Sequence, residues 1–227
     1  MGSLEGFGAL AGQAALWAIP VLTAVILHEV AHGYVALRCG DDTALRMGRL
    51  TLNPLPHIDP VGTLLIPGLL LFVGAPWIFG YARPVPVNFS RLRDPRRQMV
   101  WVALAGPGMN LVLAVGCAFL LHRLAAGYYE VTALQAVAAV SSGYSAPLVQ
   151  MAWYGMLINV VLAVFNMLPI PPLDGGRVMV GLLPIPYARR LAQLEPFGFM
   201  IVVFLLMTDS LRAILGTPVR LVLGALL

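Results

Sequence analysis

The chain has 227 residues, of which 59% are hydrophobic and only 11% are charged. Soluble proteins carry about a quarter charged residues, so this composition excludes an ordinary soluble domain and predicts an all-α polytopic protein of the lipid bilayer. The positive charge comes from arginine alone and lies beside apolar segments, which indicates membrane topology and no nucleic acid binding.

The first predicted span covers about residues 9–37, long enough for a hydrocarbon core of about 30 Å. A cleavable signal peptide has basic residues before its apolar core. Here no arginine or lysine precedes the span, and Glu5 is acidic, so we expect this helix to be retained. The span contains His28-Glu29-Val30-Ala31-His32. On a helix, His28 and His32 lie on one face and could bind one metal ion, with Glu29 acting on its water.

An ordinary polar helix face is the alternative explanation of this motif. An ionisable group at the centre of a bilayer-spanning helix costs about 2.5–3.5 kcal/mol on insertion scales. Several such groups together in an apolar run favour a metal site.

The next segment changes pattern. Residues 44–53 alternate as in a short strand, and three prolines within residues 53–60 predict an irregular turn. His57 and Asp59 in this turn are candidates for a gate. The simpler interpretation is that they satisfy loop backbone groups, as such residues do in turns.

Residues 61–79 are apolar but interrupted by prolines and glycines, so the segment either spans once or is re-entrant. Arginines flank it on both sides, for example Arg46 before it and Arg91 after it. The preference of arginine for cytoplasmic loops favours the re-entrant path, which leaves both flanks in the cytoplasm.

Residues 81–88 are predicted to form a second strand of a small membrane-associated β-sheet or hairpin. Pro84 and Pro86 lack amide donors and belong on an outer edge. The other edge, with the amides of Arg83, Val85 and Val87, is predicted to pair with the 44–53 strand or with an extended peptide substrate.

Three further spans are predicted at about residues 99–121, 148–168 and 197–215, so that residues 1–227 form a single transmembrane domain. Asn110 is a polar residue near the start of the second span, where it needs a partner. The third span ends at Asn166, and a proline-rich segment leads from there to Asp174.

A catalytic zinc site needs a third protein ligand besides two histidines, and an open position for water. Asp174 is the acid best placed for this role. Asp94 lies in a basic loop and Asp209 falls on the far side, while Asp41 and Asp42 are expected in a solvated turn.

Together, the HExxH motif at 28–32, the Ala105-Gly106-Pro107 and Asn110 segment, and the Asn166 to Gly175 motif resemble the site-2 protease family of intramembrane zinc metalloproteases. The resemblance covers about residues 15–215 and implies a site-2 protease-like transmembrane core. The 227 residues leave no room for a PDZ or CBS domain.

The resemblance implies that His28, His32 and Asp174 bind one zinc ion and that Glu29 is the general base. It implies that Asn166 binds the scissile carbonyl or its oxyanion, and we extend this role to Asn110. It also implies membrane-embedded β structure between the first two core spans.

The predicted function is hydrolysis of peptide bonds within or near transmembrane helices of membrane-bound regulatory proteins. We expect the enzyme in the inner or plasma membrane, with its active site towards the cytoplasm. A metal-ion transporter or sensor, or an inactive homologue that acts as a membrane scaffold, is the alternative. The sequence does not indicate the oligomeric state.

Overall fold

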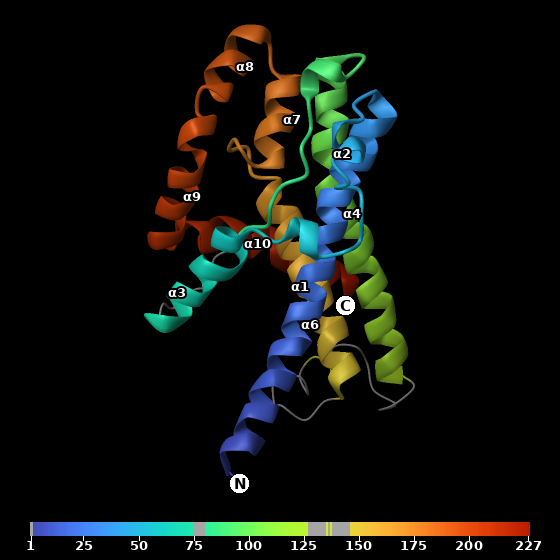
Figure 1. Cartoon of the computed structure of the whole chain (residues 1–227), viewed down its shortest axis with the longest axis vertical. Coiled ribbons are helices and arrows are strands. Elements are labelled where there is room, and N and C mark those ends of the chain that lie inside the picture. Colours follow the sequence, from blue (N-terminus) through green and yellow to red (C-terminus); the bar gives the residue numbers. More distant parts are fainter. Residues whose placement is uncertain (1, 75–79, 127–134, 136, 138–145) are drawn as a thin grey trace.

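The computed structural model describes residues 2–74, 80–126, 135, 137 and 146–227. Three long helices form the centre of the molecule (Figure 1): α1 (Gly2–Cys39), α4 (Pro95–Leu124) and α6 (Pro147–Asn166). Each of the three packs against the other two. Between α4 and α6 the contact is made of buried apolar side chains, including Leu121 and Met156.

The outer surface of these helices is apolar. Trp101, Val112 and Phe119 of α4 are 64%, 65% and 68% exposed, as suits side chains that face lipid and not water. Within the described residues, four helical stretches are long and apolar enough to cross a membrane by length and composition: Leu16–Cys39, Pro95–Leu124, Pro147–Asn166 and Ile185–Met207. The prediction of a multi-pass membrane protein is therefore confirmed.

The chain after α6 folds back on itself before it continues as α7 (Asp174–Leu182), which packs against α4. Glycine is required at the start of α7, where it packs against this turn, because a Cβ on Gly175 would lie 2.2 Å from the carbonyl oxygen of Met167. A Cβ on Gly176 would lie 2.3 Å from the nitrogen of Pro171. The tight turn holds Asp174 at the start of α7, beside the central helices.

The last part of the chain contains α8 (Ile185–Ala192), a short 3-10 turn (Glu195–Phe197), α9 (Gly198–Met207) and α10 (Ser210–Leu226). The helix expected over residues 197–215 is divided in two. Asp209 has a φ of 54°, a left-handed conformation that ends α9 and turns the chain into α10, which packs against α6.

Residues 40–94 leave α1 and return to the same end of the bundle (Figure 1). The amide of Arg93 donates a hydrogen bond to the carbonyl of Cys39 at 3.2 Å. Between these points lie short elements: α2 (Thr43–Arg46), a 3-10 turn (Leu55–His57), a π-helical turn (Pro60–Leu65), α3 (Ile66–Phe72) and a 3-10 turn (Phe89–Arg91).

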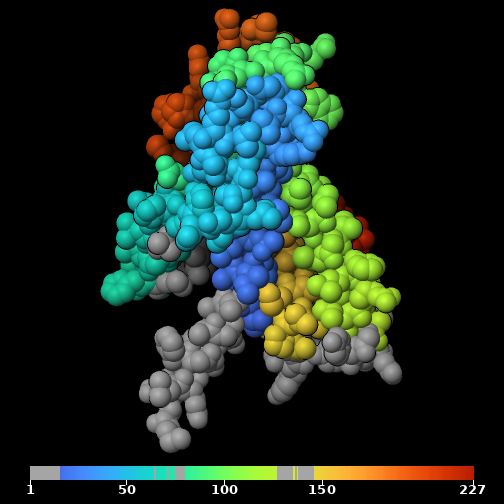
Figure 2. Space-filling view, turned by 45° about the vertical axis from the view of Figure 1, so that its right-hand side comes forward, coloured from blue at the N-terminus to red at the C-terminus, as the bar shows by residue number. Residues whose placement is uncertain are grey.

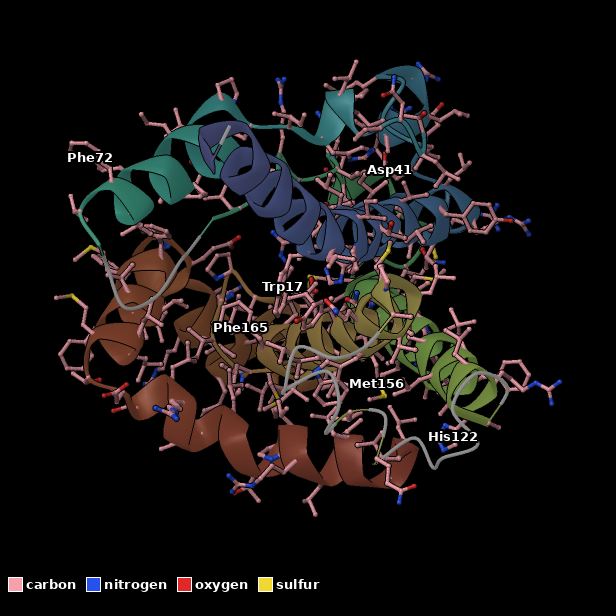
Figure 3. The ribbon with its side chains drawn as sticks, turned by 90° about the horizontal axis from the view of Figure 1, so that it is seen from below. Trp17, Asp41, Phe72, His122, Met156 and Phe165 are labelled. Atoms are coloured by element: carbon pink, nitrogen blue, oxygen red, sulfur yellow. The ribbon has the colours of Figure 1, made fainter. Side chains whose placement is uncertain are left out.

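Figure 2 shows the first part of this segment covering the upper half of α1 on one face. Phe72, which is 88% exposed, marks the outer end of α3 (Figure 3). Residues 75–79, the end of the predicted re-entrant stretch, lie outside the described residues.

The predicted β-sheet is wrong for the residues that the structure describes. Residues 43–46 form α2, and residues 80–88 are irregular, with no strand ladder in either segment. The guanidinium of Arg49 bonds the carbonyls of Arg83 and Pro84, at 2.7 Å and 3.3 Å. Side-chain contacts thus join the two segments where backbone pairing was expected.

Candidate metal centre

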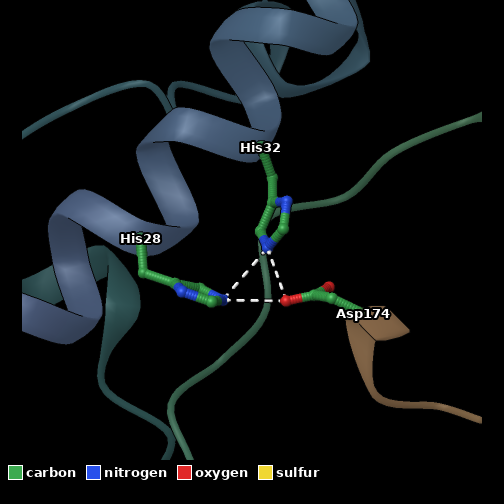
Figure 4. Close-up of side chains that lie close together, drawn as sticks. All are labelled: His28, His32 and Asp174. Carbon is green, nitrogen blue, oxygen red and sulfur yellow. Dashed lines mark hydrogen bonds and ion pairs between the residues drawn. The ribbon is translucent and has the colours of Figure 1, made fainter. Parts of the chain in front are cut away.

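His28 and His32 lie one turn apart on α1 and point to a common centre (Figure 4). Their Nε2 atoms are 3.0 Å apart, and both residues are buried, at 7% and 9% exposure. The i, i+4 spacing in the sequence produces this proximity directly, because such residues stack on one helix face.

Asp174 completes the centre from a different element. Its Oδ2 atom lies 3.3 Å from the Nε2 of His28 and 3.3 Å from that of His32. This oxygen is buried and accepts no hydrogen bond from the described part of the chain. A buried carboxylate oxygen without a donor is strongly disfavoured unless a cation satisfies it.

The other ring nitrogens indicate which atoms carry protons. The Nδ1 atom of His32 lies 2.6 Å from the carbonyl oxygen of Val102, which can only accept, so Nδ1 donates. The Nδ1 of His28 lies 2.5 Å from Oδ1 of Asn110. In the neutral rings both Nε2 atoms then present lone pairs towards each other and towards Asp174.

The three ligand atoms fit a zinc ion. Zinc bonds to nitrogen and oxygen of about 2.0 Å place tetrahedral ligand atoms about 3.3 Å apart, close to the separations of 3.0, 3.3 and 3.3 Å here. Two imidazoles and one carboxylate leave a fourth position open, as a catalytic zinc site requires. Converging lone pairs and a carboxylate repel one another without a cation.

Gly106 of α4 has no side chain, and the imidazoles of the metal centre fill the space where a Cβ would lie. A Cβ at this position would lie 2.3 Å from Nε2 of His32 and 2.6 Å from Nε2 of His28. The glycine in the Ala-Gly-Pro segment therefore allows α4 to pass directly behind the two imidazoles.

Glu29 follows His28 and faces the segment 80–88. Its Oε2 atom accepts a hydrogen bond of 2.7 Å from the amide of Val85. This bond orients the carboxylate beside the centre and explains why Val85 does not pair with another strand.

A cleft of about 480 Å³ opens next to the three ligands. Its lining includes Glu29, Asn166 and Arg177, together with apolar residues of the segment 80–88 and of α9. Asn166 ends α6, and its Nδ2 donates one hydrogen bond to the carbonyl of Leu162 at 3.1 Å. An amide nitrogen has two hydrogens, so a second donor remains for a bound molecule.

Asn110 does not line this cleft. It is fully buried in α4, and its amide contacts His28, Asn159 and the carbonyl of Ala24. An oxyanion in the cleft would not reach it. Sequence reasoning did not assign Val102 or Asn159 as partners, because these contacts join residues far apart in the chain.

The predicted substrate edge is partly occupied by the protein itself. The amide of Arg83 donates to the carbonyl of His57 at 2.9 Å, and that of Val85 donates to Glu29. Val87 lines the cleft, and its amide has no partner among the described residues.

His57 and Asp59 satisfy loop groups near this segment. His57 is 3% exposed, and its Nε2 lies 2.9 Å from the carbonyl oxygen of Thr51. Asp59 accepts hydrogen bonds from the amides of Val61 and Gly62. Neither residue lines the cleft in this structure, so their contacts fit the simpler of the two interpretations.

Asp41 was expected in a solvated turn but is only 1% exposed. Its carboxylate accepts from the amide of Thr43 at 3.0 Å and from the amide of Asn88 at 2.6 Å. Burial acts to raise the pKa of Asp41, but these bonds, the hydroxyl of Thr43 and the charge of Arg91 outweigh it and hold that pKa below its ordinary 3.8. Asp41, which follows α1, is thereby joined to Asn88 at the end of the segment 80–88.

Apolar membrane helices together with an HExxH motif and a third ligand, Asp174, from a distant part of the chain are typical of helical membrane metallopeptidases. Residues 16–208 match the sequence model of peptidase family M50. The chain belongs to this family, and the predicted relation to the site-2 proteases is confirmed.

Individual relatives agree with this family. The chain is 42% identical over 190 residues to YwhC of Bacillus subtilis, provisionally named a zinc metalloprotease; the match covers 84% of this chain and 79% of that protein. It is 36% identical to Rip2 of Mycolicibacterium smegmatis, also provisionally a zinc metalloprotease, over 84% of this chain and 66% of the relative.

A third relative is Rip2 of Mycobacterium tuberculosis, with 32% identity over 81% of this chain and 64% of that protein. The chain thus spans somewhat less than two thirds of both Rip2 proteins. No solved structure matches the chain at a significant level.

Proposed function

We propose that this protein is an intramembrane zinc metalloprotease that hydrolyses peptide bonds within or near transmembrane helices of membrane-bound regulatory proteins. The observation that carries the proposal is the convergence of the His28, His32 and Asp174 ligand atoms beside Glu29 in one cleft. Its membership of a peptidase family supports the same chemistry.

His28, His32 and Asp174 would hold one zinc ion per chain. Zinc bound at such a site would act as a Lewis acid and would lower the pKa of its water to about 7. The protein contributes a site whose ligands are buried and already converge, so that little reorganisation accompanies binding.

Glu29 acts as the general base. The amide of Val85 holds Oε2. Oε1 has no hydrogen-bond partner in the described part of the chain and can take a proton from the attacking water and return it to the leaving amine. The hydrogen bond fixes the carboxylate in place without requiring a second side chain.

Asn166 stabilises the developing oxyanion through the amide hydrogen that Leu162 does not use. A donor in this role typically contributes about 2.7–4 kcal/mol to the transition state. Asn166 lines the cleft with Glu29, whereas the buried Asn110 takes a different part.

A substrate helix must unwind before its carbonyl is accessible, since helical carbonyls are hydrogen-bonded within the helix. Val87 lines the cleft, and because its amide has no partner among the described residues, it can bind an unwound substrate strand. Arg83 and Val85 shape this segment through their bonds to His57 and Glu29, so we assign substrate contact to Val87.

The arginine distribution supports an active site towards the cytoplasm of the inner or plasma membrane. Transport of metal ions is less well supported. It requires a polar path across the bilayer, and the polar Asn159 of α6 points instead to Asn110 within the bundle.

The decisive experiment is Glu29→Gln in purified protein. Zinc content should stay at one ion per chain, while cleavage of a model transmembrane substrate should fall by at least about 10³-fold, because the base is lost. Asp209→Asn is the matched control, since it removes a carboxylate between α9 and α10 and should leave cleavage unchanged. Cleavage by the Glu29→Gln protein at the wild-type rate would disprove the assignment.

A further inference from the structure

Two buried amides connect α6 to the metal centre. Nδ2 of Asn110 donates to Oδ1 of Asn159 at 2.8 Å, and Oδ1 of Asn110 lies 2.5 Å from Nδ1 of His28. Asn110 and Asn159 are 0% and 2% exposed. Because all these groups are removed from water, each hydrogen bond must be satisfied inside the protein.

The positions of the oxygen and the nitrogen in each side-chain amide follow from the contact of Asn159 with the backbone carbonyl of Gly155. Nδ2 of Asn159 lies 2.8 Å from the carbonyl oxygen of Gly155, which can only accept a hydrogen bond. This contact requires the nitrogen of Asn159 to face Gly155, so its oxygen faces Asn110.

The same argument then applies to Asn110. Its amide nitrogen must face the oxygen of Asn159, and its second hydrogen is directed to the carbonyl of Ala24 at 3.3 Å. The oxygen of Asn110 therefore faces His28. An amide oxygen cannot donate, so the proton of the neutral His28 ring lies on Nδ1 and the lone pair on Nε2.

His32 needs no such arrangement. Its Nδ1 donates to the carbonyl of Val102, which belongs to the backbone of α4 and cannot rotate. The amide of Asn110 can turn by 180° about its last side-chain bond, and would then present a donor to His28. Among the described residues, the contact to Asn159 and the longer one to Ala24 are the hydrogen bonds that oppose this rotation.

We propose that Asn159 is a positioning residue of the metal site, which acts through Asn110 to set the tautomer of His28 that binds the metal. The inference rests on the proposed function in that it takes His28 as a zinc ligand. Partners that orient a ligating histidine typically change metal affinity by 10–100-fold when removed.

The test compares zinc affinity in three purified variants, measured by competition with a chelator. Asn159→Leu removes the acceptor of Asn110 and should weaken zinc binding by about 10–100-fold. Asn159→Asp keeps an oxygen towards Asn110 and, when protonated, a donor towards Gly155, so it should restore affinity to within a few-fold of wild type. Val160→Ala is the control, because Val160 is the next residue of α6 and is equally buried.

A spectroscopic measurement separates the tautomer from general stability. The chain has four histidines, so ¹⁵N shifts of labelled, metal-free protein can be assigned to His28. Wild type should show a proton on Nδ1, and Asn159→Ala should show a mixture with the Nε2-protonated form.

Wild-type zinc affinity in Asn159→Leu, or an unchanged His28 spectrum in Asn159→Ala, would overturn the inference. An equal loss of zinc affinity in Val160→Ala would also overturn it, because the loss would then come from disturbed packing of α6 and not from the hydrogen bonds of Asn159 and Asn110. If wild-type protein itself binds no zinc, the proposed function fails, and that result is distinct from all three.

Discussion

At the scale of single residues, the metal centre consists of three ligands whose partners come from other helices. His28 and His32 come from α1, Asp174 from α7, and the groups behind the histidines from α4. The HExxH spacing is local, so the sequence alone identified the histidines and Glu29. The partners of the two histidines, Asn110 and Val102, are 82 and 70 residues away, and no local pattern pairs them with the histidines.

Removing Asp174 tests the least local of the ligands. Asp174→Ala should release zinc to well below one ion per chain, because two imidazoles alone make an incomplete site. Metal analysis of purified protein measures this, with His32→Ala as a variant that should behave alike. One tightly bound zinc in Asp174→Ala would remove this residue from the ligand set.

Gly106 offers a steric test with a control on the same helix. Gly106→Ala places a methyl group within 2.6 Å of both histidine Nε2 atoms, so the rings must move and zinc affinity should fall at least tenfold. Gly108→Ala meets nothing within 4 Å, and replaces glycine by a better helix former. Zinc titration of both proteins should separate them; equal affinities would show that the site can shift freely.

At the scale of elements, the segment 80–88 is held beside the centre by side chains that belong to other elements. Arg49 bonds its carbonyls, Glu29 bonds the amide of Val85, and Asp41 bonds the amide of Asn88. The sequence predicted an edge strand here, with Pro84 and Pro86 on its outer side, but a strand needs a partner backbone. Side-chain bonds occupy several of the groups that a ladder would use, and the described residues form no sheet.

The buried contact of Asp41 should make stability depend on pH. Its folded-state pKa lies below the ordinary value, so the ionised carboxylate stabilises the fold above about pH 4. This contribution disappears as the pH falls through the folded-state pKa.

Asp41→Asn should therefore lower the free energy of unfolding by about 1.5–3 kcal/mol at pH 7, and the difference from wild type should shrink towards pH 3. Denaturation in detergent at both pH values provides the measurement. Asp42→Asn is the control, because its ion pairs with Arg46 and Arg91 are more exposed and should contribute at most about 1 kcal/mol. A constant difference between pH 7 and pH 3 would contradict this account.

At the scale of the whole molecule, the path of residues 40–94 determines where the catalytic groups meet. The segment begins and ends at one end of the bundle, joined there by the bond from Arg93 to Cys39. α4 therefore runs antiparallel to α1 and α6 runs back (Figure 1), which brings Asp174 to the depth of the histidines. A single crossing by residues 61–79 would place Asp174 at the opposite side.

Cysteine labelling tests this topology in membranes. In a background of Cys39→Ala and Cys117→Ala, the exposed position Ser90 should, as a cysteine, react with an impermeant maleimide only in inside-out vesicles. Arg123→Cys lies at the other end of α4 and should react only in right-side-out vesicles. Labelling of Ser90→Cys only in right-side-out vesicles would contradict the re-entrant path.

The sequence by itself determined that the chain is a multi-pass membrane protein and which family it belongs to. It also identified the HExxH motif and Asp174 as the candidate third ligand. These features depend on composition and on residues close in the chain, which periodicity and motif spacing report. Only the tertiary structure decided that the segment 80–88 is not a strand, that Asp41 is buried, and that Asn110 faces His28 and not the cleft. Those outcomes depend on which distant side chain satisfies each buried polar group, and that choice exists only once the helices have packed.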